Sequence, residues 1–421
     1  MKRIFITDEH ISSQKNGVGT YRQQLFTCLA DSGNELNLLS FNSDENHFRI
    51  DRQNGMTTYH FPVIGNGAFL ACGGLSLAIL KLYVEDSPDN VFFVNHSPCL
   101  AFLQALRTYY PKSGIVFVIH DQGWTASLLG NREKLRNILN LKRIPSNNKE
   151  SIRYVRKYCS EERRMYRKAD VVVCLSPTTK ALLETLYGVP AAKIRLIPNS
   201  LSLPVAETDR DVSRTTARRA LGIRNEEKVL LFVGRPVRAK GLHALLKAFS
   251  ALCRQRTGLR LVIAGNMSSP EHFMELGSEC APSIIYTGLI SRERLELWYR
   301  AADIGVLPSY TEQCSFAGME MMSHRLLIVS TDGNGLTDMF RHQENAIIAN
   351  IGNREDETDF VENLKRALSA ALDMPENERE ALCARAYETV SKLYAPQRMK
   401  AGYEKLLHDL STIKEKSGKS R

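Results

Sequence analysis

Apolar runs alternate with amphipathic stretches along almost the whole chain. Short runs rich in Val, Ile, Leu and Phe predict buried strands, and the stretches between them, with an apolar residue every three to four positions, predict helices. Strands that alternate with helices are typical of parallel sheets covered on both faces. In the first half of the chain the predicted strands are 3–7, 36–41, 57–61, 91–95, 115–120, 171–175 and 194–197.

A second alternating set follows a break in this pattern. Residues 204–216 are polar and carry charges of both signs without an apolar period, which predicts a linker. A chain of 421 residues is also longer than one ordinary domain. We therefore predict an α/β fold with two Rossmann-like, doubly wound domains, at 1–203 and 204–396. The predicted strands of the second set are 229–233, 261–264, 284–287, 304–307, 327–330 and 346–348.

The end of the chain is predicted to return to the first domain. Pro396 cannot continue the helix that approaches it, so a new helix is predicted at 397–412. This helix is expected to pack back on the first domain, and 413–421 is expected to be a basic, frayed tail.

Several features predict a protein of the cytoplasm. The first apolar run is too short for a signal peptide and is better explained as a strand. The charge-free run 61–80 contains four glycines, and we expect a loop followed by a buried helix there instead of a membrane span. The nine cysteines include no Cys-x-x-Cys pair, which favours free thiols in a reducing compartment.

The net charge of +10 is concentrated in one helical stretch. Residues 131–168 hold thirteen Lys or Arg and four Glu, a surplus of nine. Two interpretations stay open: a solvated helix face, or docking on anionic lipid headgroups or an acidic acceptor, which would place the protein at the inner face of the membrane. Nucleic acid is not expected as a partner, because aromatic residues are not interleaved with the basic ones.

In doubly wound sheets, ligands bind in the loops that follow the carboxyl ends of the strands. The first strand is followed by a loop that contains Gly17 and Gly19 and leads into a helix. These glycines would let a phosphate or sugar approach the amides at the helix N-terminus. A tight turn explains them equally well, because the third glycine and the ribose-binding acid of a dinucleotide site are missing.

A second loop, 234–241, follows the apolar strand at 229–233. It begins with Gly234 and contains Arg235 and Lys240. A guanidinium and an ammonium in such a loop, with a helix beginning behind them, predict a cradle for a diphosphate.

The third loop leads from the strand that ends near Pro308 into a helix. Residues Ser315 to Gly318 would open this helix with free amides. The carboxylates of Glu312 and Glu320 can accept hydrogen bonds from sugar hydroxyls, although spacing alone would also fit a solvated helix face.

Two histidines follow strands of the first domain. His96 follows the strand 91–95, and His120 with Asp121 closes the strand 115–120. A single histidine at a strand end is often a structural hydrogen-bond donor, but two at equivalent strand ends indicate one functional edge of the sheet.

The order of these pieces resembles glycosyltransferase family four, which comprises retaining enzymes of the GT-B fold. The resemblance covers nearly the whole chain. Its motifs are the glycine loop, Asn95-His96-Ser97, His120-Asp121, Ala169-Asp170, Leu175-Ser176, Ile197-Pro198-Asn199-Ser200, Phe232 to Arg235, Lys240-Gly241, Tyr286-Thr287-Gly288, Ala302-Asp303 and the pair Glu312 and Glu320.

The resemblance implies two domains that face each other across a cleft, the first for the acceptor and the second for a nucleotide sugar. By this resemblance, Arg235 and Lys240 bind the diphosphate of the donor, and Glu320 binds its ribose. The backbone at Ile290, after Gly288, flanks the base.

The remaining roles also come from the resemblance. Glu312 and the amides of Ser315, Phe316, Ala317 and Gly318 are expected to meet the donor sugar and phosphate. His120 is expected to reach the transferring sugar from the other domain, with His96 and Asp121 on the acceptor side.

The resemblance, taken with these patterns, implies a retaining hexosyltransferase that uses a nucleotide sugar as substrate and needs no further cofactor. UDP is favoured by the family over GDP and ADP, and the acceptor would be a glycan, a lipid-linked molecule or a peptide. No metal is expected, because the only Asp-x-Asp triplet, at 209–211, lies in the predicted linker. The alternatives are a nucleotide-sugar epimerase of the same fold, an NAD(P)-dependent oxidoreductase, and a protein that binds a nucleotide sugar or glycan without turnover.

Overall fold

The structure is a computed structural model of the chain, and its helices and strands divide between two compact units. It describes residues 1–9, 17–30, 32–53, 55–64, 69–95, 99–142, 149–203, 210–266 and 270–418. Unit 1 comprises Met1–Ser127, Arg132–Ser200 and Pro396–Arg421, and unit 2 comprises Leu128–Asn131 and Leu201–Ala395.

Unit 1 is built on an eight-stranded sheet with the order β3-β4-β2-β1-β5-β6-β7-β8. All neighbouring strands are parallel except β3 and β4, which form an antiparallel pair. The sequence did not predict β3, because its residues are polar and its strand lies at the edge of the sheet. The strands are β1 (Arg3–Glu9), β2 (Glu35–Ser43), β3 (Arg49–Gln53), β4 (Met56–Pro62), β5 (Asn90–Val94), β6 (Gly114–Val118), β7 (Val171–Cys174) and β8 (Ile194–Leu196).

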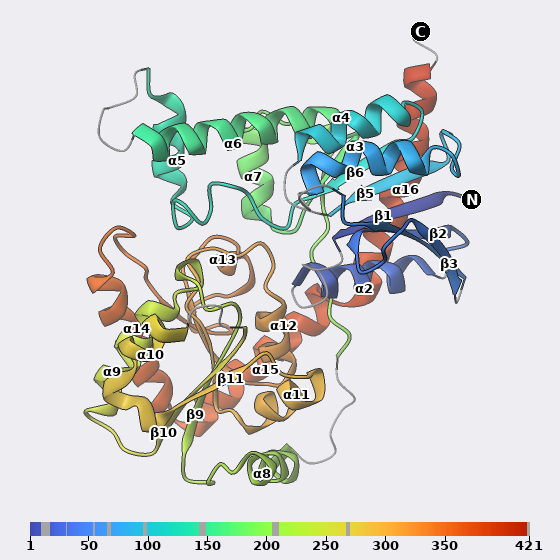
Figure 1. Ribbon diagram of the computed structural model, residues 1–421. Helices are drawn as coiled ribbons and strands as arrows, with labels where there is room; N and C mark the ends of the chain where they lie inside the picture. The colour runs from blue at the N-terminus through green and yellow to red at the C-terminus, as the bar shows by residue number, and fades with distance from the viewer. Residues whose placement is uncertain are drawn as a thin grey trace. The chain divides into compact units, whose positions relative to one another are not determined.

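Along the chain, the helices of unit 1 alternate with these strands, apart from α16 at the end of the chain (Figure 1). They are α2 (Gly17–Ala30), α3 (Phe69–Leu80), α4 (Leu100–Tyr109), α5 (Arg132–Asn140), α6 (Lys149–Lys168), α7 (Pro177–Thr185) and α16 (Pro396–Gly418), with a 3₁₀ turn, η1, at Ala191–Lys193.

The chain returns to unit 1 at Pro396, and α16 packs against α2. The hydroxyl groups of Tyr403 on α16 and Tyr21 on α2 are hydrogen-bonded, and both side chains are fully buried. The helix continues to Gly418, so the predicted frayed tail is wrong for residues 413–418.

Unit 2 is built on a six-stranded sheet with the order β11-β10-β9-β12-β13-β14, parallel throughout. The chain starts in the middle of this sheet, proceeds to one edge, and then crosses back to build the other half, which is the arrangement of dinucleotide-binding sheets. The strands are β9 (Lys228–Val233), β10 (Leu259–Ala264), β11 (Ile284–Gly288), β12 (Ile304–Leu307), β13 (Leu327–Thr331) and β14 (Ile347–Ala349).

The helices of unit 2 cover both faces of this sheet. Right-handed crossovers place α9 and α10 on one face and α11 and α12 on the other, and in Figure 1 these pairs lie on opposite sides of the strands. Helix α14 packs on α9, and α15 packs on α12. The helices are α8 (Arg210–Leu221), α9 (Leu242–Cys253), α10 (Pro270–Leu276), α11 (Arg292–Ala301), α12 (Phe316–Ser323), α13 (Leu336–Met339), α14 (Thr358–Leu372) and α15 (Glu376–Leu393), with 3₁₀ turns η2 (Arg238–Lys240) and η3 (Ser278–Ser283).

Helix α8 covers residues 210–216 of the predicted linker, and a buried arginine on its next turn anchors the helix. Arg218 is fully buried and donates to the carboxylate of Asp303 at 2.7 Å and to four backbone carbonyls, one of them that of Ala301 at 3.0 Å. Asp303 also accepts from the amide of Val229 at 2.7 Å. The segment 204–216 was predicted as a linker because its charged residues show no apolar period, and this pattern does not reveal that Arg214 donates to Asp303 at 2.5 Å.

The family resemblance implies that the two domains face each other across a cleft, and this arrangement stays a prediction. Among the described residues, no helix is both long enough and apolar enough to cross a membrane.

Candidate functional site

The expected donor site lies at the point in unit 2 where the strand order reverses. Strand β9 pairs with β10 on one side and with β12 on the other. The loop after β9 and the loop after β12 therefore leave neighbouring strands at the carboxyl edge of the sheet, where doubly wound folds bind ligands.

The structure brings these two loops into direct contact. The amide of Tyr310 donates to the carbonyl of Ala239 at 2.9 Å. Gly241 has φ +70°, and a Cβ atom there would lie 1.8 Å from the carbonyl oxygen of Pro308. Only glycine fits this position, because it accepts a left-handed backbone and leaves room for the neighbouring loop.

An ion pair joins the same loops. Lys240 Nζ lies 2.6 Å from Glu312 Oε1, and the hydroxyl of Ser309 donates to the same oxygen at 2.8 Å. The two charged side chains are 25% and 12% exposed, so they are partly shielded but within reach of a ligand. The backbone of Glu312 is held as well, since its amide donates to the carbonyl of Asn334 at 2.8 Å.

Arg235 is the other expected cation of this edge. Its side chain is exposed and makes no ion pair among the residues that the structure describes. The preceding Gly234 donates its amide to the carbonyl of Ala264 at 3.0 Å, which fixes the point where the loop leaves the sheet. The loop therefore presents one paired cation, Lys240, and one exposed cation, Arg235.

The N-terminus of α12 offers fewer free amides than the sequence suggests. The hydroxyl of Ser315 caps the helix and accepts from the amide of Gly318 at 3.1 Å. The amide of Ser315 itself points at the sulfur of Met339, at 3.3 Å. The helix cap therefore uses the amide of Gly318, and the sulfur of Met339 accepts from the amide of Ser315; the binding of a ligand by these amides stays a prediction. The amides of Phe316 and Ala317 have no acceptor within the described part of the chain.

Glu320 lies on the second turn of α12 and is nearly buried. One of its carboxylate oxygens accepts from Tyr299 Oη at 2.5 Å, and the other accepts from the guanidinium of Arg292. Arg292 is the first residue of α11 and is 55% exposed. Ile290, which the sequence places at the base, lies two residues before it and is half-buried. Arg292 and Tyr299 were not predicted, because they pair with Glu320 from a separate helix.

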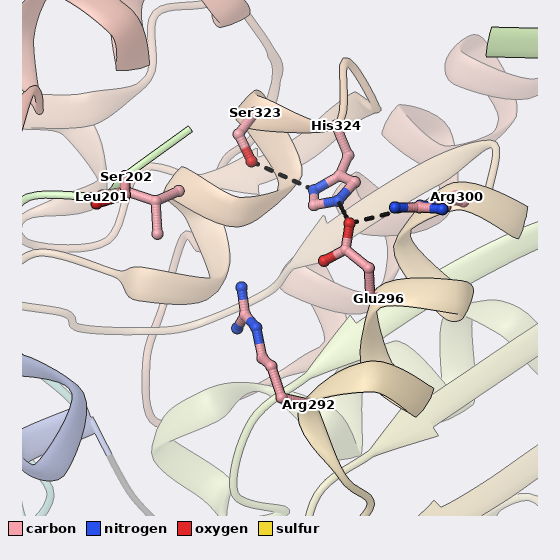
Figure 2. Close-up of a pocket in the computed structure, with 7 residues that line it drawn as sticks. All are labelled: Leu201, Ser202, Arg292, Glu296, Arg300, Ser323 and His324. Atoms are coloured by element: carbon pink, nitrogen blue, oxygen red, sulfur yellow. Dashed lines mark hydrogen bonds and ion pairs between the residues drawn. The ribbon is translucent and has the colours of Figure 1, made fainter. Parts of the chain in front are cut away.

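A pocket of about 330 Å³ lies beside Arg292, and none of the predicted site residues lines it (Figure 2). In Figure 2 the guanidinium of Arg292 extends into it from α11. Glu296 accepts from His324 Nε2 at 2.6 Å, and this hydrogen bond is the main cause that lowers the pKa of Glu296. The lining residues are Leu201, Ser202, Arg292, Glu296, Arg300, Ser323 and His324.

The wall of this pocket also supports Glu320. Ser323 Oγ and His324 Nδ1 each lie 2.8 Å from the backbone carbonyl oxygen of Glu320. The ring of Tyr299, which donates to the carboxylate of Glu320, stacks on His324 with the ring centroids 4.9 Å apart. These groups fix both the backbone and the side chain of Glu320, so residues that line the pocket also hold Glu320 in place.

In unit 1, His120 follows β6. Its ring packs edge-on against the ring of Tyr21 on α2, with the centroids 4.5 Å apart. Asp121 is exposed, and its carboxylate accepts from the hydroxyl of Thr125 at 2.5 Å and from the next amide in the chain. Asp121 therefore caps its own turn, which fits a structural role. His96 lies outside the described residues.

Gly17 and Gly19 do not form the expected loop. Both belong to the first turn of α2, where Gly17 is exposed and Gly19 is buried. The helix predicted to begin at Gly19 begins two residues earlier, so the loop prediction is wrong for Gly17, and residues 10–16 lie outside the described residues.

A buried acid on α6 holds the loop that follows His120. Glu162 is fully buried, accepts from the amide of Gly123 at 2.8 Å and accepts from the hydroxyl of Tyr187. Burial raises the pKa of Glu162 to about 7, and its two hydrogen bonds only partly oppose this. A Cβ on Gly123 would lie 2.5 Å from the ring of Tyr158, so α6 holds this loop by contact as well. No motif in the sequence marks Glu162.

Two family models match this chain. Residues 15–203 match the family described as Glycosyltransferase Family 4, and residues 213–389 match Glycosyl transferases group 1. The chain belongs to this family of glycosyltransferases. The family resemblance seen in the sequence is confirmed, and the oxidoreductase alternative is set aside.

Relatives from several organisms match at low identity. D-inositol 3-phosphate glycosyltransferase of Pseudarthrobacter chlorophenolicus is 25% identical over 377 residues, which cover 86% of this chain and 85% of that protein. An uncharacterized glycosyltransferase of Methanocaldococcus jannaschii, MJ1607, is 26% identical over 181 residues, which span 46% of its length and 42% of this chain.

Solved structures confirm the GT-B fold. Sucrose-phosphate synthase from Thermosynechococcus elongatus superposes with a TM-score of 0.74 at 18% identity, covering 98% of this chain and all of that one. HepE of Anabaena, solved in complex with UDP-glucose, has a TM-score of 0.68 at 13% identity and covers 97% of this chain and all of its own.

The contact between Gly241 and Pro308 predicts a strong effect of one methyl group. Gly241→Ala should lower the stability of the protein by more than about 3 kcal/mol, because the Cβ overlaps a backbone carbonyl. Gly222 is a matched control, since it has the same φ of +70° and nothing within 4 Å of a Cβ. Gly222→Ala should cost only about 1 kcal/mol of backbone strain. Thermal unfolding of both variants tests this, and equal losses would contradict it.

The burial of Glu162 predicts a pH-dependent stability. A folded pKa of about 7 lies above the unfolded value of about 4.3. The folded state therefore binds this proton more tightly, and stability should fall as the pH rises between these two values. Glu162→Gln should reduce that slope, measured by unfolding between pH 4.5 and 8. Tyr187→Phe should move the window upward, because the tyrosine hydrogen bond favours the charged carboxylate; an unchanged slope in Glu162→Gln would contradict the assignment.

Proposed function

We propose that this glycosyltransferase moves a hexosyl group from a UDP-sugar to its acceptor with retention of configuration and without a metal. The observation that carries this proposal is the contact between the two loops at the strand-order reversal of unit 2. These loops bring Arg235, Lys240 and Glu312 to one edge of the sheet, beside the N-terminus of α12. UDP is favoured because HepE, a structural neighbour, was solved with UDP-glucose.

The cations and the helix terminus would stabilise the leaving group. As the bond between the anomeric carbon and the diphosphate breaks, negative charge develops on the diphosphate. Lys240 and Arg235 neutralise that charge, and the amides of Phe316 and Ala317 donate to it at the positive end of α12. This charge neutralisation is the work that a metal ion does in other transferases, so the proposal includes none.

The carboxylates would orient the donor. Glu312 accepts hydrogen bonds from sugar hydroxyls once Lys240 turns to the phosphate, and Glu320 accepts from the ribose beside Arg292. With retention, the leaving phosphate oxygen takes the proton of the acceptor on the same face, so no protein base is assigned. His120 contacts the transferring sugar from unit 1.

The acceptor is a glycan, a lipid-linked molecule or a peptide. The name of the D-inositol 3-phosphate relative adds phosphorylated small molecules to these classes. A thermal-shift panel of UDP, GDP, ADP and their sugars tests the donor, because a ligand that binds the folded state raises the unfolding midpoint. If GDP or ADP raises the unfolding midpoint more than UDP does, the donor is a sugar of that nucleotide and the UDP part of the proposal is wrong.

The proposal includes a peripheral contact between α5–α6 and an anionic membrane. Among the residues of 131–168 that the structure describes, which exclude 143–148, eight Lys or Arg side chains are exposed: Arg132, Arg136, Lys142, Lys149, Arg153, Lys157, Arg164 and Arg167. The exposed Tyr154 adds an aromatic group to this face.

Vesicle co-sedimentation tests this contact. Binding to vesicles with 30% phosphatidylserine should fall severalfold when Arg153, Lys157 and Arg164 are replaced by Ser, and it should fall with salt. The control replaces the exposed Arg341, Arg366 and Lys392 of unit 2 by Ser, and it should leave binding unchanged. Equal binding to neutral vesicles would contradict the proposal.

Lys240→Ala should reduce turnover at least a hundredfold, measured as release of UDP from the donor that the panel selects. Losing one charge-assisted donor at a developing anion raises the barrier by about 2.7–4 kcal/mol. Lys247 on α9 is exposed and serves as the control, and Lys247→Ala should leave turnover unchanged. Near-normal turnover of Lys240→Ala would remove this residue from the site.

A further inference from the structure

A nearly buried acid outside every sequence motif lies against the two loops of the donor site. Glu357 immediately precedes α14, and its side chain is only 10% exposed. It accepts hydrogen bonds from Tyr310 Oη at 3.0 Å, from His243 Nδ1 at 2.5 Å and from Arg238 Nε at 3.3 Å. One carboxylate therefore joins the loop after β12, the first turn of α9 and the turn η2.

The first of these partners, Tyr310, is the residue on which the two loops meet. It is fully buried, and its amide donates to the carbonyl of Ala239 at 2.9 Å. Its own carbonyl accepts from Arg354 at 3.1 Å, and its ring packs edge-on against Phe360, with the centroids 5.2 Å apart. Because the rest of Tyr310 is enclosed, the bond to Glu357 is what satisfies its hydroxyl.

The other two partners flank Lys240 in the sequence. Arg238 opens the turn η2 that ends at Lys240, and His243 is the second residue of the helix behind it. Glu357 thus fixes the backbone on both sides of Lys240 and, through Tyr310, the backbone that leads to Glu312.

Glu357 carries a negative charge close to a loop that is expected to bind a diphosphate. Burial alone would raise its pKa, but His243, Tyr310 and Arg238 together lower it below the ordinary value. By Coulomb's law alone, such a charge weakens the binding of an anion nearby. An acid at this place is therefore better explained by what it holds than by what it attracts.

We propose that Glu357 is a positioning residue that holds the Arg238–Lys240 turn and the Tyr310–Glu312 segment in the geometry that binds the donor diphosphate. This inference rests on the proposed function, since it assigns the diphosphate to these loops. In this proposal Glu357 acts through Lys240 and Glu312 and does not itself contact the substrate.

The sign of one mutational effect separates positioning from electrostatics. If Glu357 acts only through its charge, both Glu357→Ala and Glu357→Gln should bind UDP more tightly than the parent protein. If it positions the loops, Glu357→Ala should bind UDP at least tenfold more weakly. Glu357→Gln should then recover to within about threefold of the parent, because the amide oxygen still accepts from Tyr310. Calorimetric titration with UDP measures both variants.

A nucleoside without phosphates provides the second comparison. Uridine affinity, followed by NMR titration, should be the same in Glu357→Ala and the parent protein, because only the phosphate contacts depend on these loops. Tyr310→Phe removes a single hydroxyl and should weaken UDP binding by about threefold, which keeps the test valid if Glu357→Ala fails to fold. Tighter or unchanged UDP binding in Glu357→Ala, or an equal loss for uridine, would overturn the inference.

Glu227 is a matched control at the opposite end of β9. It is 3% exposed and paired with Arg260 at 2.7 Å, so it is a buried, ion-paired acid of the same unit. Glu227→Ala should lower the unfolding temperature and leave UDP affinity unchanged. A loss of UDP affinity in this control equal to that of Glu357→Ala would assign both effects to stability and overturn the inference.

Hydrogen exchange distinguishes a failure of this inference from a failure of the proposed function. If the parent protein binds neither UDP nor another nucleoside diphosphate, the proposed function fails. The positioning role is then read from the amides of 237–241 and 309–314, which should exchange at least tenfold faster in Glu357→Ala than in Glu227→Ala. Equal exchange in the two variants would overturn the inference.

Discussion

The candidate site depends on the close approach of two backbones at the middle of the second sheet. A side chain at Gly241 would overlap the carbonyl oxygen of Pro308, so the loops after β9 and β12 meet with no atom between them. One backbone hydrogen bond, from the amide of Tyr310 to the carbonyl of Ala239, and one ion pair, between Lys240 and Glu312, then set their register. The chemistry proposed for unit 2 requires these loops to stay together, because its cations are on one loop and its acid is on the other.

The charges at this edge are largely neutralised within the protein. Lys240 pairs with Glu312, and Arg292 pairs with Glu320, so each acid expected to orient the donor already has a cation. A partly buried cation that exchanges a carboxylate for a phosphate keeps an anionic partner throughout, which avoids most of the cost of leaving a charge desolvated and unpaired. Arg235, which is exposed, adds positive charge without having to break a pair. The site can thus be preorganised for a diphosphate without an excess of buried charge.

The sequence predicted the elements whose signal is local. Strand ends and the loops behind them placed Arg235, Lys240 and Glu312 at one edge, because parallel strands bring their carboxyl ends together. It failed where burial contradicts polarity: residues 210–216 of α8 were predicted to be a linker because they are polar, although the buried Arg218 anchors this helix just beyond them. The glycines at the start of α2 were predicted to be in a loop because glycine is a poor helix former and gives no hydrophobic signal for a helix that begins at Gly17.

The residues that the sequence could not reveal are those that act from another element. Arg292, His324 and Glu357 reach the site from the ends of α11, α12 and α14, at separations along the chain that no short motif encodes. Each is a charged or titratable residue whose partner lies more than 25 positions away or on a different loop. Side chains of this kind are ordinary surface residues by composition, and only the folded contacts distinguish them.

Two buried acids, one in each unit, show how the same residue type serves different electrostatic conditions. Glu162 has only neutral donors, the amide of Gly123 and the hydroxyl of Tyr187, so burial dominates and its pKa rises to about 7. Glu357 has Arg238 and His243 as well as Tyr310, so its pKa is lowered although it too is removed from water.

Both acids hold a loop that carries a proposed site residue, His120 in unit 1 and Lys240 in unit 2. The loop proposed to bind the diphosphate is held by an acid whose charge is balanced by cations, and the loop in unit 1 is held by an acid that can become neutral. An anchor beside an anionic ligand must keep its hydrogen bonds fixed while the ligand binds, and pairing its charge with Arg238 limits the repulsion that the same charge would otherwise exert.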